Sequence, residues 1–257
     1  MKKDERIKIA KETLDIFNTK LKEENRKSYD QAIIIIEHDI NLQKKYKQPA
    51  SITVVNQSVI DTFIYSSYHY GILNFASAYH PGGGYLNGAL AQEETLCYGS
   101  NLYNLQRKFD QEYYEYNKSK KTKCYSDRMI YTPNTIYIRN DAYQLLTQPI
   151  YADVLTSPAV NMGAALFKGE DKEKCETIMK NRMRKILNVF SKYNDRIILG
   201  AFGCGVFRND PQLIAKYWYE LLYQEEWIYC FKEIIFAVFD KTKEQNTFNQ
   251  FCKILKK

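Results

Sequence analysis

The sequence predicts an α/β fold, a three-layer domain in which a mixed, largely parallel sheet lies between layers of helices. Two observations predict this class. Short runs rich in β-branched residues alternate along the chain with longer amphipathic stretches, as they do where strands are joined by crossover helices. Apolar residues make up 45% of the 257 residues, which is enough for a sizeable core and too many for a disordered chain. We expect residues 1–50 to form a helical extension packed on the same domain as residues 51–257.

Local patterns give the elements in order. The first predicted helix covers residues 4–25, because apolar residues from Ile7 to Leu21 recur at steps of three and four with charges between them. After Pro49 the β-branched runs begin, and the predicted strands cover residues 52–55, 71–76, 135–139, 154–156, 196–201 and 233–239. The later predicted helices cover residues 91–107, 171–191, 211–224 and 243–255. The helix at 211 has a well-marked start, since Asp210 can cap its free amides and Pro211 suits its first turn.

Residues 110–127 form one long irregular insert that is rich in Tyr and Lys. We interpret this insert as a solvated loop. The alternative is a contact with a polyanion, since lysines beside aromatic rings can hold phosphates and stack bases.

Charge and targeting signals narrow the choice of partner. The excess of 37 Lys and Arg over 30 Asp and Glu gives a net charge of +7, which permits a polyanionic partner without requiring one, so no specific nucleic acid is predicted. No apolar run approaches the roughly 20 residues of a membrane span, and the charged N-terminus lacks the apolar core of a signal peptide. A cytoplasmic location is therefore the default expectation, with a nuclear location as the alternative.

Neither a metal nor a cofactor is expected. The six cysteines are scattered without a C-x-x-C pair, and the three histidines form no H-E-x-x-H motif, so we predict free thiols and no metal site. The chain also lacks the G-x-S-x-G nucleophile elbow and the G-x-x-x-x-G-K-[ST] phosphate loop. The usual serine hydrolase and P-loop nucleotidase classes are thereby excluded.

A glycine triplet marks the first candidate site. Gly82, Gly83 and Gly84 follow the predicted strand at 71–76 and precede a helix. Ligands of parallel sheets lie at the carboxyl ends of the strands, and glycines let backbone amides approach a ligand closely. The triplet favours a cradle for a phosphate or a polyhydroxyl ligand, while a flexible turn is the commoner meaning of such a triplet.

Two adjacent carboxylates follow the triplet. Glu93 and Glu94, preceded by Gln92, stand near the start of the predicted helix. Acidic residues in that position can be surface charges favoured by the helix dipole. Directly after a glycine cradle, in a chain with no other catalytic motif, they suit glycosidic cleavage, in which a carboxyl group protonates the leaving oxygen and then activates water.

A second glycine loop, residues 200–210, has the same layout of strand, glycine turn and capped helix. Its glycines can serve turn geometry alone, and Phe207 can be a core side chain. Two such loops in one sheet also suit the opposite walls of a cleft for a diphosphate, with Phe207 packed on a sugar.

These motifs together resemble the microbial-type poly(ADP-ribose) glycohydrolases, a branch of the macrodomain superfamily. The resemblance rests on Pro81-Gly82-Gly83-Gly84, a seven-residue spacer and Gln92-Glu93-Glu94, and it covers roughly residues 50–240. Four further segments look family-like and occur in the family's order, namely residues 73–76, 131–134, 156–161 and 200–207.

The resemblance implies a macrodomain-like fold and hydrolysis of the ribose–ribose bonds of poly(ADP-ribose), with ADP-ribose as product and no metal or cofactor. The partner is then the polymer or an ADP-ribosylated protein. The resemblance also implies that Glu94 is the catalytic acid and that Glu93 holds hydroxyls of the distal ribose. The implied substrate-binding residues are Asn74, Gly82, Gly83, Gly84, Asn87, Gln92, Gly203, Cys204, Gly205, Val206 and Phe207. The triplet would lie against the distal ribose, residues 203–206 would wrap the diphosphate, and Phe207 would pack on that ribose.

The implied mechanism needs Glu94 to be protonated near neutral pH, and we expect partial burial and a charge on Glu93 to favour this form. Glu94 donates to the leaving 2′-oxygen, an oxocarbenium-like ribose forms beside the diphosphate, and Glu94 then takes a proton from water. One alternative is a non-hydrolytic ADP-ribose-binding module, which needs both glycine loops and neither glutamate. Another is a hydrolase of mono-ADP-ribosyl or other ADP-ribosyl derivatives.

Overall fold

A seven-stranded mixed sheet forms the centre of the protein. The computed structural model describes residues 1–256, and its strands are β1 (Ile33–Ile35), β2 (Ser51–Val55), β3 (Gly71–Phe75), β4 (Met129–Arg139), β5 (Leu145–Ser157), β6 (Arg196–Leu199) and β7 (Glu233–Ala237). The strand order is β1-β4-β5-β3-β6-β7-β2. From β5 to β2 all neighbours run parallel, whereas β4 is antiparallel to β5 and β1 to β4. The predicted mixed, largely parallel sheet is confirmed.

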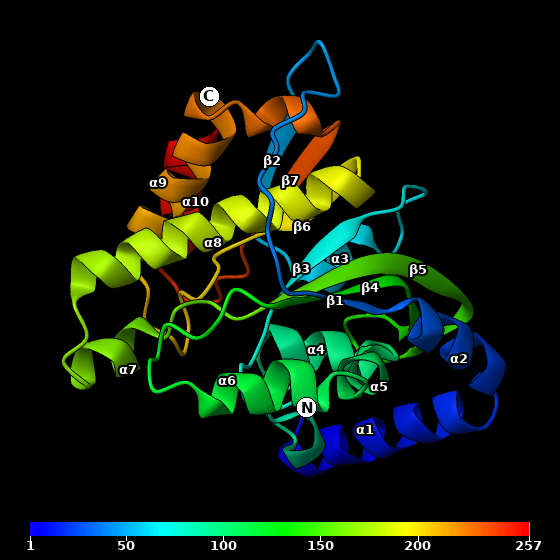
Figure 1. Ribbon diagram of the computed structural model, residues 1–257. Coiled ribbons are helices and arrows are strands. Elements are labelled where there is room, and N and C mark those ends of the chain that lie inside the picture. Colours follow the sequence, from blue (N-terminus) through cyan, green and yellow to red (C-terminus); the bar gives the residue numbers. More distant parts are fainter. Residues whose placement is uncertain (257) are drawn as a thin grey trace.

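Helices cover both faces of the sheet (Figure 1). Their bounds are α1 (Lys3–Asn18), α2 (Lys22–Gln31), α3 (Val59–Phe63), α4 (Gln92–Gly99), α5 (Leu102–Arg107), α6 (Tyr116–Ser119), α7 (Met162–Phe167), α8 (Lys172–Tyr193), α9 (Pro211–Tyr219) and α10 (Asn246–Leu255). Short helical turns are η1 (Tyr85–Asn87), η2 (Asp110–Glu115), η3 (Glu220–Gln224) and η4 (Trp227–Cys230). In Figure 1, α8, α9 and α10 lie on one side of the sheet, and α1, α4 and α5 lie on the other.

Successive side chains of the central strands point in turn into two separate apolar cores, one on each face of the sheet. Leu73 of β3 and Ile197 of β6 join the core beneath α8, α9 and α10. Their neighbours Ile72 and Ile198 point to the opposite face and join the core shared with α4. Strand residues must alternate in this way because successive side chains leave a strand on opposite faces. Both faces are buried, which explains the unbroken apolar runs that predicted these strands.

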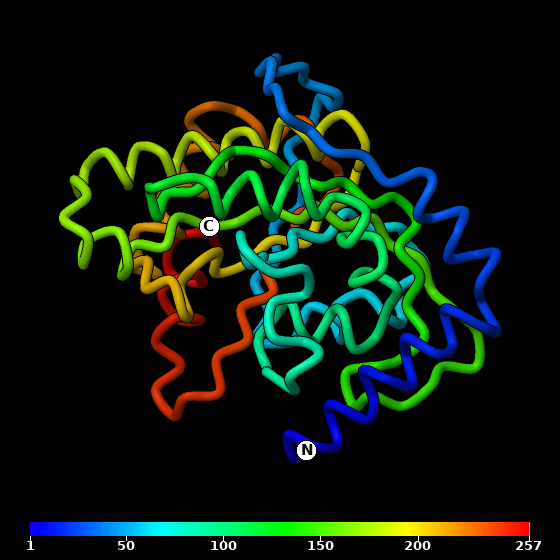
Figure 2. Tube along the Cα trace, turned by 60° about the horizontal axis from the view of Figure 1, so that its bottom comes forward, coloured from blue at the N-terminus to red at the C-terminus, as the bar shows by residue number. Residues whose placement is uncertain are grey.

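The segment before residue 50 differs from the single helix expected at 4–25. The chain forms two helices, because Thr19 leaves the helical conformation and its hydroxyl donates to the carbonyl of Asp15. Residues 33–35 then add the edge strand β1 to the sheet, so the segment is not wholly helical. Figure 2 shows α1 running along the outside of the molecule, where the Tyr85 hydroxyl donates to the carbonyl of Ala10 and Arg139 pairs with Glu12 at 2.8 Å.

Two further expectations need correction. The helix predicted over 91–107 is interrupted at Ser100, whose extended backbone forms a bridge with Tyr137 of β4. The Tyr/Lys insert is not a loop throughout, since η2 is a π-helical turn that continues into α6. Tyr113 and Tyr114 are 0% and 1% exposed and pack with Phe109 in a small core of their own. Their burial makes this part of the insert structural.

None of the described helices is long and apolar enough to span a membrane.

Candidate active site

The side chain of Gln92 fixes the start of α4 to the end of β3. Its amide nitrogen donates to the carbonyl of Leu73 at 2.8 Å, and its oxygen accepts from the amide of Phe75 at 2.8 Å. Both bonds go to β3 backbone beyond the residues that pair with β6, which are Gly71 and Ile72. Gln92 therefore orients the first turn of α4, in which Glu93 and Glu94 follow directly.

Glu93 lies in a fully satisfied, buried site and is 3% exposed. One carboxylate oxygen accepts from the amide nitrogens of Asn74 at 3.1 Å and Gln106 at 2.9 Å, and the other accepts from the backbone amide of Ser77 at 2.7 Å. Burial raises the pKa of Glu93 to about 8, against the opposing effect of these donors. The site holds Glu93 rigidly at the end of β3.

The raised pKa of Glu93 predicts a pH-dependent stability. Because its folded-state pKa of about 8 lies above the ordinary 4.5, the folded protein binds more protons than the unfolded chain between these values. The free energy of unfolding therefore falls as the pH rises from about 5 to about 8, by roughly 3–4 kcal/mol for this group. Urea denaturation across this range is expected to show a smaller decline for Glu93→Gln. Parallel pH dependences in the two proteins would refute the assignment.

Glu94 has one bonded and one unpaired oxygen. It is 7% exposed, and its Oε1 accepts from the backbone amide of Gly84 at 2.8 Å. Its Oε2 is buried and has no hydrogen-bond partner within the described residues 1–256. Oε2 is therefore the oxygen of Glu94 that is free to contact a substrate.

The glycine triplet packs directly on both carboxyl groups. Gly82 and Gly83 have φ of +62° and +58°, a conformation that glycine adopts at low cost. A Cβ on Gly83 would stand 2.5 Å from Oε1 of Glu94 and 3.1 Å from Oε2 of Glu93. The Gly82 amide donates to the Gln106 side chain at 2.8 Å, so one glutamine joins the loop to Glu93. The triplet needs glycine because the chain and the carboxyl groups are in contact.

The second glycine loop offers free backbone donors. Gly205 and Val206 are exposed, and within residues 1–256 the amides of Gly205, Val206 and Phe207 donate to no acceptor. Gly203, at φ +75°, packs on Ala159 and Asn209 and gives the loop its turn. Adjacent unpaired amides attract anions. The loop therefore presents backbone donors of the kind that bind phosphate, and phosphate binding by this loop stays a prediction.

A cavity of about 630 Å³ lies between the start of α4 and the second glycine loop. Its lining includes Phe75 and Gln92 beside the carboxylates, Cys204 and Gly205 of the second loop, residues 57–60 and residues 237–241. A nucleotide-sized ligand fits a cavity of this volume.

Of the expected site residues, Gln92, Cys204 and Gly205 line this cavity, and the others lie around or away from it. Asn74 is 0% exposed and donates to Glu93 and to Thr156, so it positions a carboxylate. Asn87 is exposed in η1 and is outside the cavity lining. Phe207 is half-buried, with its ring 5.9 Å from that of Tyr125.

Gln106 and Ser77 are the functional residues that the sequence did not reveal. Gln106 is 0% exposed in α5, next to the core residue Leu105. A buried polar residue on an apolar helix face is the only signal that could have marked it. Ser77 contacts Glu93 through its backbone, which no side-chain pattern can show.

Comparison with known proteins agrees with this geometry. Residues 2–140 match the family model of the microbial-type PARG catalytic domain. The crystal structure of poly(ADP-ribose) glycohydrolase (PARG) from Thermomonospora curvata is similar at 28% identity and a TM-score of 0.90, covering 98% of this chain and 100% of that chain. A complex of that enzyme with the inhibitor ADP-HPD gives 27% identity and a TM-score of 0.85, covering 97% and 99%. PARG from Deinococcus radiodurans in complex with ADP-ribose gives 31% identity and a TM-score of 0.83, covering 90% and 97%. No curated protein matches the chain.

The fold and these matches define a glycosidase with a macrodomain-like fold. The chain belongs to the microbial-type poly(ADP-ribose) glycohydrolase family, whose members hydrolyse poly(ADP-ribose). The family model begins at residue 2, so the helices before residue 50 belong to the matched domain and the resemblance is not confined to residues 50–240. A boundary at residue 50 stays a prediction.

Proposed function

We propose that this chain cleaves the ribose–ribose bond of poly(ADP-ribose) with Glu94 as general acid and then general base. The main support for Glu94 as the acid is that its Oε2 is buried and unpaired while its Oε1 accepts from the amide of Gly84. A carboxyl group held in this way presents one fixed and one free oxygen, and the free oxygen can donate a proton to the leaving 2′-oxygen in the transition state.

The steps follow from that assignment. The proton on Glu94 passes to the leaving oxygen as the glycosidic C–O bond breaks, and the bonding electrons leave with that oxygen. The oxocarbenium-like ribose is stabilised by the substrate's own diphosphate, which the free amides of residues 205–207 hold. Water then adds to the ribose carbon and gives a proton to Glu94, which restores the starting state. Glu93, fixed by Asn74 and Gln106, orients the ribose hydroxyls.

The ligands of the two relatives support this placement. The T. curvata structure contains ADP-HPD and the D. radiodurans structure contains ADP-ribose, and both proteins share this fold. We infer that the 630 Å³ cavity takes the ADP-ribose end of the polymer or of an ADP-ribosylated protein. We place the reaction in the cytoplasm, which the six free thiols support.

The product distinguishes this proposal from its alternatives. Purified poly(ADP-ribose) and a mono-ADP-ribosylated protein should be offered separately, and released nucleotides identified by chromatography. We expect ADP-ribose from the polymer at a rate far above release from the modified protein. Faster release from the protein would identify a mono-ADP-ribosyl hydrolase, and binding without any release would identify a binding module.

The ring of Phe207 is expected to contribute to substrate binding. Phe207→Ala should lower kcat/KM for polymer hydrolysis about tenfold, since packing by one aromatic ring is worth about 0.5–1.5 kcal/mol beyond its area. Phe167→Ala is the matched control, because Phe167 is 93% exposed at the end of α7 and belongs to neither glycine loop. Equal kcat/KM values for the two variants would show that Phe207 serves packing alone.

A further inference from the structure

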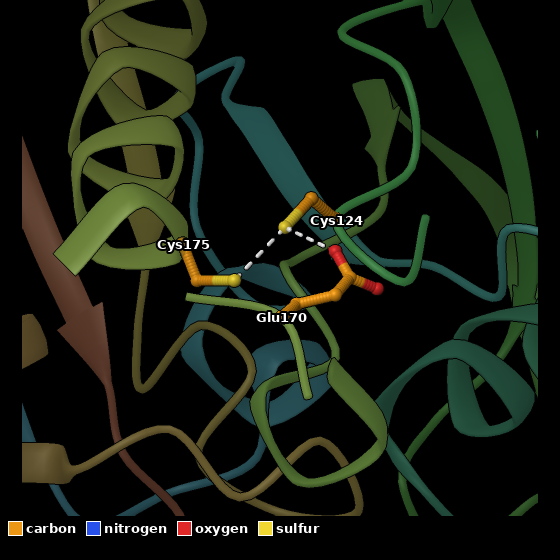
Figure 3. Close-up of side chains that lie close together, drawn as sticks. All are labelled: Cys124, Glu170 and Cys175. Carbon is orange, nitrogen blue, oxygen red and sulfur yellow. Dashed lines mark hydrogen bonds between the residues drawn. The ribbon is translucent and has the colours of Figure 1, made fainter. Parts of the chain in front are cut away.

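Three side chains from separate segments bring metal-binding atoms together outside the active-site cleft. Cys124 lies between α6 and β4, Glu170 in the turn between α7 and α8, and Cys175 in the first turn of α8. Figure 3 shows the two sulfurs and the carboxylate pointing toward one another. The sulfurs are 3.2 Å apart, and Sγ of Cys124 lies 3.5 Å from Oε2 of Glu170. We propose that Cys124, Glu170 and Cys175 form a site for a thiophilic divalent cation, Zn²⁺, with water as the fourth ligand.

The donor set and its spacing suit zinc. Two thiolates and one carboxylate are ligands that Zn²⁺ accepts in tetrahedral sites. From Zn–S bonds of about 2.3 Å and a Zn–O bond of about 2.1 Å, a tetrahedral ion needs sulfur–oxygen spacings of about 3.6 Å and a sulfur–sulfur spacing of about 3.8 Å. The observed 3.5 Å between Cys124 and Glu170 already fits. The two sulfurs at 3.2 Å must separate by only about half an ångström.

A disulfide is the competing use of the two cysteines, and the geometry favours it less. Its sulfurs must close to about 2.05 Å, so Cys124 and Cys175 would have to approach by more than about 1 Å from 3.2 Å. Disulfide formation also needs an oxidant to accept two electrons. Zinc binding needs no electron transfer, because the cation replaces two thiol protons, which pass to solvent.

Burial and neighbouring hydrogen bonds prepare the three ligands. Cys124 and Cys175 are 2% and 1% exposed, whereas Glu170 is half-buried, so the side toward Glu170 can admit a water ligand. The other oxygen of Glu170 accepts from the backbone amide of Lys123 at 2.6 Å, and the Thr122 hydroxyl donates to Oε2. Hydrogen bonds of this kind orient metal-binding carboxylates.

The site would connect two segments next to the cleft. None of its residues lines the 630 Å³ cavity, but Lys123 donates to the Tyr79 hydroxyl at 2.8 Å, and the Tyr125 ring contacts those of Tyr79 and Phe207. A cation bound by Cys124 and Cys175 would fix residues 122–125 on the start of α8.

No metal is expected from the sequence because these cysteines are 51 positions apart, and only the fold brings them together.

Metal content tests this proposal directly. The reduced wild-type protein should be incubated with ZnCl₂, freed of loose metal on a desalting column and analysed by mass spectrometry for zinc. We expect about one equivalent in the wild type and less than about one tenth in Cys175→Ser. Cys252→Ser is the matched control, since Cys252 lies in α10 outside the cluster, and it should retain the full equivalent.

Cobalt gives a second readout that needs no substitution. Co²⁺ in the wild-type site should produce a thiolate-to-cobalt charge-transfer band that zinc abolishes, and Glu170→Gln should weaken cobalt binding without removing the band. Equal zinc content in the wild type and Cys175→Ser, or no cobalt band in the reduced wild type, would overturn the proposal. Polymer hydrolysis plays no part in either measurement, so the result is independent of the proposed reaction.

Discussion

Glu94→Gln is expected to lower the rate of polymer hydrolysis by about 10²- to 10⁴-fold, the range that a positioned general acid–base group supplies. Glutamine keeps the acceptor that Gly84 needs and removes the proton that Oε2 would donate. Because the change replaces a buried group by one of the same shape, the fold should persist. ADP-ribose release from poly(ADP-ribose) under saturating substrate measures the effect.

A substrate with a more reactive leaving group can distinguish proton donation by Glu94 from its other roles. In a nitrophenyl glycoside of ADP-ribose, the leaving group is nitrophenolate, which needs little protonation as it departs. Glu94→Gln should therefore slow hydrolysis of this glycoside at least about tenfold less than it slows polymer cleavage. An equal loss on both substrates would mean that Glu94 acts on water or on substrate position and not on the leaving oxygen.

Gly83→Ala is expected to have the second largest effect, a loss of about 100-fold in polymer hydrolysis. Its Cβ would stand 2.5 Å from the Oε1 atom of Glu94, so either the loop or the carboxyl group must move, and displacements near 1 Å cost about that much. The positive φ of +58° adds a stability cost of roughly 1–2 kcal/mol.

Gly169→Ala is the matched control for the stability cost of placing a side chain at a positive φ. Gly169 has φ +76°, and no atom of the described residues lies within 4 Å of its would-be Cβ. Both variants should lose the stability that the positive φ costs in urea denaturation, Gly83→Ala should lose more because of its clash, and only Gly83→Ala should lose activity. Equal activity in the two variants would show that contact between Gly83 and Glu94 is not needed.

The sequence indicated the sheet and the reacting pair because each depends on local signals. β-Branched runs predicted the buried strands β3, β6 and β7. The glycine triplet and the two carboxylates after it marked the candidate site, but their direct contact was not predicted. Such signals work where the residue type itself is required, as with positive φ at Gly83.

The remaining features depend on contacts between distant segments. Gln106 reaches Glu93 from a different helix, and Ser100 breaks the predicted helix because it bridges to β4. Tyr113 and Tyr114 lie in a charged stretch that looked solvated, yet the fold buries them. Cys124 and Cys175 become neighbours only when α8 packs beside the segment before β4. Periodicity within a short window cannot report any of these contacts.

A paired measurement of turnover and binding decides whether Glu94 is the general acid of this protein. ADP-ribose release from purified poly(ADP-ribose) should be followed for the wild type and Glu94→Gln, with binding of free ADP-ribose to both proteins measured by calorimetry. We expect rapid release by the wild type, release at least about 100-fold slower by the variant, and similar binding by both. Binding without release by the wild type, or undiminished release by Glu94→Gln, would contradict this expectation.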